Sequence, residues 1–388
     1  MSANDHERWH AGRVPVDDHV ADRVDLPPLP PAPTPRPPWA YLVAAVALVA
    51  LAVGAVAVAA RVDPGELAGR VDPQDLPVGE PVPALHVEGW LNSPSLGAAD
   101  LVGRVVVYDF WTYSCVNCVR TLPHLRAWWD RYRDDGLVIV GVHSPEFDFE
   151  RDHTNVAGAV ERLGVTWPVA LDDHHAAFDA FDNHWWPAKY VADRDGRLRY
   201  RHIGEGAYDE TEDVLRELLG VDPSSPRAAG PGGADPAPPT EVITPETYLG
   251  TSRGRAGATF GERDYPDPGE LGVDEVALAG RWAADAERVR SLEPGASIVL
   301  RYRAAEVNLV LAADGDGPVD VTVEVDGRPV PADWRPDGVA AAPDGSTAVT
   351  VTVPDLYRLV RSPEVGEHTI RLTAQGAGVS AFAFTFGG

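Results

Sequence analysis

Two cysteines separated by two residues, Cys115 and Cys118, constrain this chain more than any other feature. The apolar, β-branched run at 105–108 precedes them and predicts a buried parallel strand. Apolar and aromatic side chains then recur at three- and four-residue spacing over 119–132, which predicts an amphipathic helix. The sequence therefore places Cys115 near the start of a helix and Cys118 one turn inside it.

Cysteines in this position favour dithiol–disulfide exchange. The unsatisfied N–H groups and the positive end of the helix dipole stabilise a thiolate, so Cys115 is predicted to be the nucleophile near neutral pH. Cys118 can then attack the mixed disulfide that forms. We therefore interpret Cys115–Cys118 as a redox-active disulfide and expect no other cofactor.

Two other interpretations of the cysteine pair stay open. A zinc site needs more ligands, and with only 2 cysteines in the chain some of the 12 histidines would have to complete it. The strand–CxxC–helix arrangement is the wrong frame for a zinc finger or ribbon. The spacing of His174, His175 and His184 matches no ligand set, so we interpret them as surface residues and expect no metal. A purely structural disulfide across so short a loop would restrict the unfolded chain very little.

Length and charge limit the class of protein. At 388 residues the chain can hold two domains and extensions, and its net charge of −26 argues against nucleic acid as a partner. Because no cysteine lies outside the pair, a disulfide framework of the kind found in small secreted domains is excluded.

The N-terminal part predicts a membrane anchor. Residues 1–38 are acidic and proline-rich, which indicates a disordered tail. Residues 39–60 carry no charge and are long enough for a transmembrane helix, with a cleavable signal as the alternative. Residues 61–78 are interpreted as a polar stalk. The flanking arginines determine the orientation poorly, and on functional grounds we expect a single-pass protein of the cell membrane with extracytoplasmic C-terminal domains.

Residues 79–221 alternate strands with helices, which predicts an α/β domain built on a mostly parallel sheet. After the cysteine helix, strands are expected at 137–143, 185–191 and 197–203, and 168–171 is a short apolar piece. Helices are expected at 150–163, 174–181 and 211–219. Residues 222–239 are rich in proline, glycine and alanine and are interpreted as a linker.

Residues 240–388 predict an all-β domain. Short alternating strands separated by Asp-Gly and other glycine-rich turns indicate a β-sandwich of jelly-roll type. Its aromatic side chains could stack on the sugar rings of an envelope glycan, although aromatic residues of a sandwich more often fill the core. The residues considered are Trp282, Tyr302, Trp334 and Tyr357. Packing on the α/β domain or docking of a protein partner is the alternative role for this domain.

Four segments carry a resemblance to known families. They are FWTYSCVNC at 110–118, VHSPEF at 142–147, WWPAKY at 185–190 and TPETYLG at 244–250. With these segments the chain resembles the thioredoxin superfamily, and within it the membrane-anchored TlpA/ResA-type thioredoxins. It is similar in particular to the extracytoplasmic part of DipZ-type proteins. These join a thioredoxin-like domain to a carbohydrate-binding-module-like β domain, so the resemblance implies the same α/β-then-β order here.

The resemblance has one departure. DipZ-type proteins carry a polytopic electron-conducting domain upstream, whereas this chain predicts a single span. The resemblance therefore implies that a separate membrane thiol electron donor re-reduces the cysteine pair. It also implies that the substrates are protein disulfides and that a cell-wall glycan is a further candidate partner.

The resemblance assigns roles to residues outside the cysteine pair. Trp186-Pro187 matches the cis-proline position of the superfamily, where the Trp186 backbone would pair with a substrate strand beside Cys115. A trans proline at the start of a strand is the alternative. Asp109 matches the buried acid beneath the second cysteine. Burial should raise its pKa so that it accepts a proton from Cys118, unless it is a satisfied strand-end carboxylate.

Further expectations concern Glu146, Lys189 and the aromatic residues. TlpA/ResA proteins often have a glutamate soon after the second cysteine, which this chain lacks, and Glu146 is the candidate substitute, with an ordinary loop carboxylate as the alternative. Lys189 is expected to be a snorkelling surface lysine rather than the partner of Asp109. Aromatic residues near the cysteines would form a platform for an apolar substrate segment, unless they belong to the core. These are Trp111, Tyr113, Trp185 and Trp186.

These expectations define three candidate functions. The chain is predicted to be an enzyme, a membrane-anchored extracytoplasmic thiol-disulfide oxidoreductase that reduces protein disulfides through Cys115 and Cys118. The alternatives are a disulfide donor or isomerase that uses the same cysteines, and a non-enzymatic envelope glycan-binding protein. The direction of exchange depends on the reduction potential of the pair, which a sequence does not reveal.

Overall fold

The structure is a computed structural model that describes residues 79–231, 242–315 and 317–388. The expected tail at 1–38, span at 39–60 and stalk at 61–78 lie outside the described residues. Within the described ranges, no helix is both long and apolar enough to cross a membrane.

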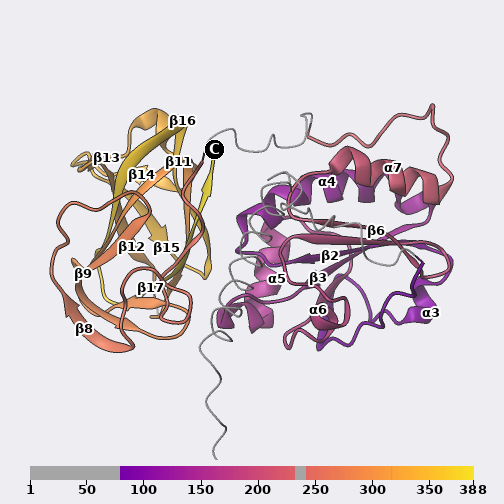
Figure 1. The fold of residues 1–388 in the computed structure, drawn as a ribbon, viewed down its shortest axis with the longest axis horizontal. Coiled ribbons are helices and arrows are strands. Elements are labelled where there is room, and N and C mark those ends of the chain that lie inside the picture. Colours follow the sequence, from indigo (N-terminus) through magenta and orange to yellow (C-terminus); the bar gives the residue numbers. More distant parts are fainter. Residues whose placement is uncertain (1–78, 232–241, 316) are drawn as a thin grey trace, which may run out of the picture. The chain divides into compact units, whose positions relative to one another are not determined.

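The first domain contains a six-stranded sheet in the order β1-β4-β3-β2-β5-β6. Strands β2, β3 and β6 of this sheet are labelled in Figure 1. Its strands are β1 (Gly89–Leu91), β2 (Val105–Trp111), β3 (Leu137–His143), β4 (Val169–Leu171), β5 (Ala188–Ala192) and β6 (Leu198–Ile203). The β2–β3 and β3–β4 pairs are parallel, whereas β1–β4, β2–β5 and β5–β6 are antiparallel. The expectation of a mostly parallel sheet is therefore wrong. A short Asp-Gly hairpin joins β5 to β6, and such a hairpin can only pair antiparallel strands.

Helices cover both faces of this sheet. They are α3 (Ala98–Leu101), α4 (Val116–Tyr132), α5 (His153–Arg162), α6 (Ala176–Ala180) and α7 (Tyr208–Leu219). Short 3-10 helices, η1 (Arg133–Asp135) and η2 (Asp148–Arg151), precede β3 and α5. The helix expected at 150–163 therefore begins only at His153, because η2 takes up the residues before it.

Strand β2 is the centre of the domain, and all seven of its residues are buried. Because side chains of a strand alternate between faces, Val105 and Val107 pack with residues of α4, α5 and α7. Val106 and Tyr108 point to the other face and pack with residues of α3 and α6. The strand that leads to Cys115 is therefore held by two separate hydrophobic clusters.

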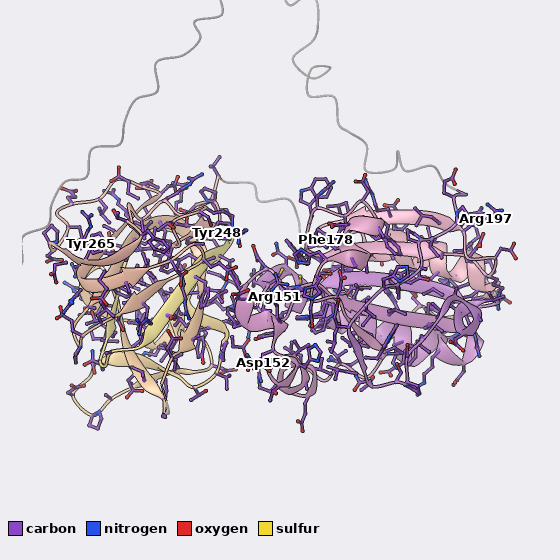
Figure 2. All side chains as sticks on the ribbon, turned by 90° about the horizontal axis from the view of Figure 1, so that it is seen from below. Arg151, Asp152, Phe178, Arg197, Tyr248 and Tyr265 are labelled. Carbon is purple, nitrogen blue, oxygen red and sulfur yellow. The ribbon has the colours of Figure 1, made fainter. Side chains whose placement is uncertain are left out.

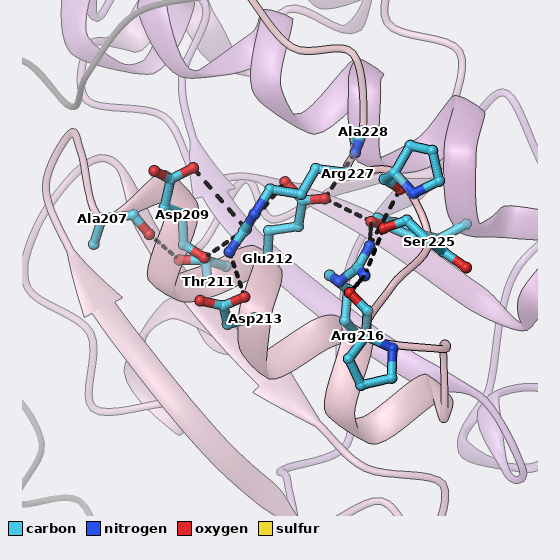
Figure 3. A network of polar contacts seen from close by, with 12 residues as sticks. Ala207, Asp209, Thr211, Glu212, Asp213, Arg216, Ser225, Arg227 and Ala228 are labelled. Atoms are coloured by element: carbon cyan, nitrogen blue, oxygen red, sulfur yellow. Dashed lines mark hydrogen bonds and ion pairs between the residues drawn. The ribbon is translucent and has the colours of Figure 1, made fainter.

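A polar network fixes the segment that follows α7 (Figure 3). The Arg216 guanidinium donates to backbone carbonyls of Asp222, Pro223, Ser225 and Pro226 at 2.9–3.2 Å. The Glu212 carboxylate accepts from the Ala228 N–H at 2.7 Å. The first part of the expected linker at 222–239 thus lies against α7, and the part from 232 on is outside the described residues.

The second domain is built from antiparallel strands. They are β7 (Thr247–Tyr248), β8 (Gly261–Tyr265), β9 (Glu275–Ala284), β10 (Val289–Ser291), β11 (Ser297–Ala313), β12 (Val319–Val325), β13 (Arg328–Pro329), β14 (Val339–Ala341), β15 (Thr347–Val351), β16 (Asp355–Ala374) and β17 (Val379–Gly387). A 3-10 helix, η3 (Ala332–Trp334), lies between β13 and β14. The β-rich character predicted from the sequence is confirmed.

The strands of this domain form one continuous sheet rather than the two separate sheets expected of a sandwich. Strand β11 pairs along one edge with β9 and then with β17, and β10 joins β9 to β17, which closes a ring of four strands. Register shifts interrupt the pairing of β11 with β16 and with β17. Such irregularities bend long strands, so β11 and β16 can line both sides of one core.

Two aromatic residues considered for glycan stacking belong to this core. Trp282 and Tyr302 are 2% and 1% exposed, and the Trp282 indole N–H donates to the Ala279 carbonyl at 2.9 Å. Trp334 and Tyr357 are partly buried and pack against the same cluster. Trp282 and Tyr302 therefore fill the core, which is the more common role given for such residues above, and they do not present ring faces to a sugar.

Gly141 of β3 provides a test of the packing around Trp111, the last residue of β2 before the turn that carries Cys115. A Cβ atom at this position would lie 3.0 Å from Nε1 of Trp111 and 3.2 Å from Nε1 of Trp167. We expect Gly141→Ala to lower the free energy of unfolding by about 1–3 kcal/mol, because two buried indole rings must shift. Urea denaturation followed by tryptophan fluorescence measures this change.

Gly269→Ala is the matched control, because nothing lies within 4 Å of a Cβ placed there. It should change the free energy of unfolding by no more than about 0.5 kcal/mol. Equal effects of the two substitutions would contradict the described packing.

Candidate active site

The two cysteines lie at the start of α4, as the sequence predicts. Cys115 is the N-cap residue, and the Cys118 N–H donates to its Sγ atom at 3.3 Å. Cys115 is partly exposed, whereas Cys118 is 1% exposed. An N–H group aimed at the sulfur stabilises a thiolate there. The geometry therefore provides one accessible sulfur and one buried sulfur behind it.

Cys118 is held as a neutral thiol. Burial raises its pKa well above the usual value, and the neighbouring Cys115 adds to the shift. A buried thiol of this kind attacks a disulfide only after another group has removed its proton. The site therefore needs a base close to Cys118.

Asp109 is the candidate base. It lies in β2 in register with Gly141 of β3 and Lys189 of β5, and it is 1% exposed. Among the described residues, its Oδ1 atom has no hydrogen-bond partner. Burial raises its pKa from 3.8 to about 6, although Lys189 lowers it, and the Asp109 charge contributes to the raised pKa of Cys118. Burial and the raised pKa agree with the prediction, and the role in proton transfer stays a prediction.

Lys189 is buried, which corrects the expectation of a surface lysine. It is 0% exposed, its Nζ atom donates to the Gly204 carbonyl at 3.3 Å, and it lies 5.7 Å from the centre of the Tyr208 ring. The physical reason is the position of β5, which pairs with β2 on one side and β6 on the other while helices cover its faces. A buried ammonium near Asp109 favours the ionised carboxylate, so Lys189 adjusts the pKa of the candidate base.

The Trp186–Pro187 peptide bond is cis, as the resemblance implies. Trp186 is partly buried and lines the same cleft as Cys115, and Trp185 beside it is 49% exposed. The cleft has a volume of about 470 Å³. Binding of a substrate backbone by Trp186 and Pro187 stays a prediction.

Trp111 and Tyr113 do not belong to a surface platform. Each is 1% exposed. The Tyr113 ring stacks on His143 with 5.7 Å between ring centres, and Trp111 meets the same imidazole edge to face at 5.4 Å. Both residues are therefore core, and only Trp185 and Trp186 of the expected platform reach the cleft.

Glu146 lines the cleft beside Cys115, and its carboxylate is held by two residues of the second domain. Its Oε1 atom accepts from the Tyr248 hydroxyl at 2.7 Å and from Arg253 at 2.9 Å. Arg253 also lies 3.9 Å from the centre of the Tyr248 ring. Glu146 is therefore more constrained than an ordinary loop carboxylate, and its role in exchange stays a prediction. Tyr248, from β7, is labelled in Figure 2.

Glu150 is a site residue that the sequence interpretation missed, because it was assigned to the start of a helix. It lies in η2, just before Arg151 and Asp152 (Figure 2), and it is 0% exposed. Its carboxylate accepts from the hydroxyl of Ser114, the residue before Cys115, at 2.6 Å. The two aromatic residues that precede it, Phe147 and Phe149, are the available signal, since they indicate that the segment is buried.

The three histidines considered as surface residues differ in exposure. His174 and His184 are exposed, whereas His175 is partly buried and its Nε2 atom lies 2.7 Å from the Pro145 carbonyl. In the described part of the chain, no group of three or more potential ligands is placed to hold a metal ion.

Comparisons with known proteins place this geometry in a family. The Redoxin family model matches residues 77–219. Thiol-disulfide oxidoreductase YkuV of Bacillus subtilis is 33% identical over 142 residues, which are 36% of this chain and 95% of YkuV. The chain belongs to the thioredoxin superfamily. A model described as thioredoxin-like C-terminal domain matches residues 244–387.

Protein DipZ of Mycobacterium tuberculosis is similar to both domains of this superfamily member. The two are 34% identical over 318 residues, which are 78% of this chain and 42% of DipZ. The chain therefore spans less than half the length of that relative. Among solved structures, a thioredoxin-like protein in the oxidized form is 30% identical over 37% of this chain and 98% of its own, with a TM-score of 0.35.

The raised pKa of Asp109 gives a pH-dependent prediction. A carboxyl group whose pKa is higher in the folded state binds its proton more tightly there, so its contribution to stability is lost as the pH rises from about 4 to about 6. At pH 7.5 Asp109→Asn should raise the free energy of unfolding by about 1–3 kcal/mol, because the cost of burying the ionised carboxylate exceeds the gain from Lys189 and is then removed. At pH 4 the two proteins should be equally stable, which denaturation at both pH values measures.

The exposed Asp179 of α6 supplies the control. Asp179→Asn should leave the free energy of unfolding within about 0.5 kcal/mol of the wild-type value at both pH values. A loss of stability in Asp109→Asn at pH 7.5 would show that the carboxylate is stabilised in the folded state instead.

Proposed function

We propose that this protein is a thiol-disulfide oxidoreductase that reduces disulfide bonds of protein substrates through Cys115 and Cys118. The observation that carries the proposal is the asymmetric pair at the start of α4, with an accessible sulfur capped by an N–H group and a buried thiol behind it. The similarity to YkuV, whose name states this activity, supports it.

The proposed reaction has two exchange steps. The Cys115 thiolate attacks one sulfur of the substrate disulfide, which forms a mixed disulfide and releases the other substrate sulfur as a thiolate. Cys118 then transfers its proton to Asp109 and attacks Sγ of Cys115. This forms the Cys115–Cys118 disulfide and releases the second substrate sulfur. The substrate gains two electrons, and the cysteine pair loses them.

Residues around the pair support these steps in different ways. Asp109 is buried and has a pKa of about 6, so it can accept a proton near neutral pH. Trp186 and Pro187, next to the cleft, would hold the substrate backbone, and the exposed face of Trp185 would contact an apolar side chain. Glu146 would contribute a carboxylate to the same cleft.

The proposal also covers the cellular setting. The uncharged segment at 39–60, outside the described residues, would anchor the protein in the cell membrane with the two domains on the extracytoplasmic side. A membrane protein with a reactive thiol pair would then reduce the Cys115–Cys118 disulfide. The similarity to DipZ supports a membrane-associated setting. Glycan binding by the second domain has less support, because Trp282 and Tyr302 are buried.

Single substitutions in the pair test the reaction. In an insulin-reduction assay with dithiothreitol as reductant, Cys115→Ser should lower the rate to that of the reductant alone, because Cys118 is too buried to attack first. Cys118→Ser should instead accumulate a mixed disulfide between Cys115 and the substrate, which mass spectrometry detects. Equal rates for the wild type and Cys115→Ser would remove the proposed function.

The direction of exchange has its own test. The reduction potential of the Cys115–Cys118 couple, measured by equilibration with glutathione buffers, should be more negative than about −200 mV if the protein acts as a reductant. A value near −120 mV, typical of a strong disulfide donor, would reverse the assigned direction.

A further inference from the structure

Glu150 joins two segments of the first domain that meet at the cleft. Its Oε1 atom accepts from the Ser114 hydroxyl at 2.6 Å. Its Oε2 atom accepts from the backbone N–H groups of Glu146 and Phe147 at 2.6 and 3.0 Å. One carboxylate therefore ties the turn that carries Cys115 to the loop after β3.

These contacts make the position of Glu150 hard to change. The side chain is completely buried, and hydrogen bonds to an ionised carboxylate are shorter and stronger than those between neutral groups. Removal of the carboxylate would leave one hydroxyl and two backbone N–H groups without partners inside the protein. The three donors therefore fix the position of the carboxylate. The carboxylate in turn links the turn that carries Cys115 to the loop after β3.

Ser114 transmits this constraint to the nucleophile. It is buried and directly precedes Cys115, whose Sγ atom lies 3.3 Å from the Cys118 nitrogen. An N–H···S contact of this length is an ordinary hydrogen bond to sulfur, and it weakens when the N–H group turns away from the sulfur, so a displacement of the turn would weaken it. The Ser114–Glu150 bond is therefore placed to keep the sulfur in front of the helix N-terminus.

We infer that Glu150 is a positioning residue for the exchange reaction. Through the Ser114 hydroxyl it fixes the turn that carries Cys115, and its charge changes the rate at which Cys115 reacts. This inference rests on the proposed function, since it assumes that Cys115 is the attacking sulfur. It adds a residue that does not touch the substrate but controls the group that does.

The charge of Glu150 changes in the working pH range of the site. Burial raises its pKa to about 7, against the effect of its hydrogen bonds. The titratable groups that face it are Glu146 on its own loop, which raises its pKa further, and Tyr113 on the turn. Below pH 7 the carboxyl is mostly neutral. Above pH 7 it carries a negative charge that is hydrogen-bonded to Ser114, the residue next to Cys115, and a nearby negative charge disfavours a second one.

The substitution Glu150→Gln removes the negative charge of the side chain but can keep the hydrogen bonds that position the turn. The amide keeps the size of the side chain, its oxygen can accept from the backbone N–H groups, and its NH₂ group can donate to Ser114. The test is the rate of iodoacetamide alkylation of Cys115, followed by mass spectrometry of the peptide that contains it. The ratio of the Glu150→Gln rate to the wild-type rate should be near one at pH 6. It should rise to about three- to tenfold at pH 8, because only the wild type then carries the charge.

A merely structural role would give the same ratio at both pH values, and that result would overturn the inference. Glu161→Gln, an exposed carboxylate of α5, is the matched control and should stay at a ratio near one throughout. If Glu150→Gln does not fold, as judged by circular dichroism, Ser114→Ala replaces it. That variant should alkylate about threefold more slowly at pH 7, because the turn loses its tether, and an unchanged rate would overturn the inference.

The insulin assay separates this inference from the proposed function. If wild type reduces insulin while the alkylation ratio stays constant with pH, the inference about Glu150 is wrong and the proposed function stands. If wild type does not reduce insulin, the proposed function is wrong, whatever the ratio of the two alkylation rates is.

Discussion

The site depends on the junction between β2 and α4. A fully buried strand ends at Trp111, and within four residues the chain becomes a helix whose first N–H groups face Cys115. The strand is fixed on both faces by hydrophobic clusters, so the turn begins from a rigid point. A flexible start would let the sulfur move away from the N–H group that stabilises its charged form. The packing of β2 therefore helps to keep the Cys115 sulfur next to the N–H group that stabilises its thiolate.

Asp109, Lys189 and Glu150 are buried around this junction, and each has a compensating contact. Asp109 has Lys189 across the β2–β5 pair, Lys189 has the Gly204 carbonyl and the Tyr208 ring, and Glu150 has three hydrogen-bond donors. The compensation is incomplete for both carboxyl groups, because their pKa values stay above the usual ones. Incomplete compensation costs stability but leaves groups that exchange protons near neutral pH, which disulfide exchange requires.

The sequence predicts those parts of the site that are determined by residues close to each other along the chain. Cys115 and Cys118 could be placed at a helix start from one strand pattern and one helix pattern, and Pro187 followed from its motif. Lys189, Trp111 and Tyr113 were misjudged because their burial depends on strands and helices far away in the sequence. Glu150 was missed for the same reason, since nothing near it indicates that Ser114, 36 residues earlier, is its partner. The single continuous sheet of the second domain likewise depends on pairings between distant strands.

The loop after β3 connects the exchange site with the second domain. On one side Glu150 binds the cysteine turn, and on the other Phe147 and Phe149 pack on Phe382 of β17, with ring centres 5.1 and 4.8 Å apart. Neighbouring residues of one short loop thus contact both the turn and β17. Because a close-packed interior transmits strain, a displacement of these aromatic contacts would disturb the carboxylate contacts a few residues away. The position of the loop therefore depends on its contacts with β17 as well as on those with the turn that carries Cys115.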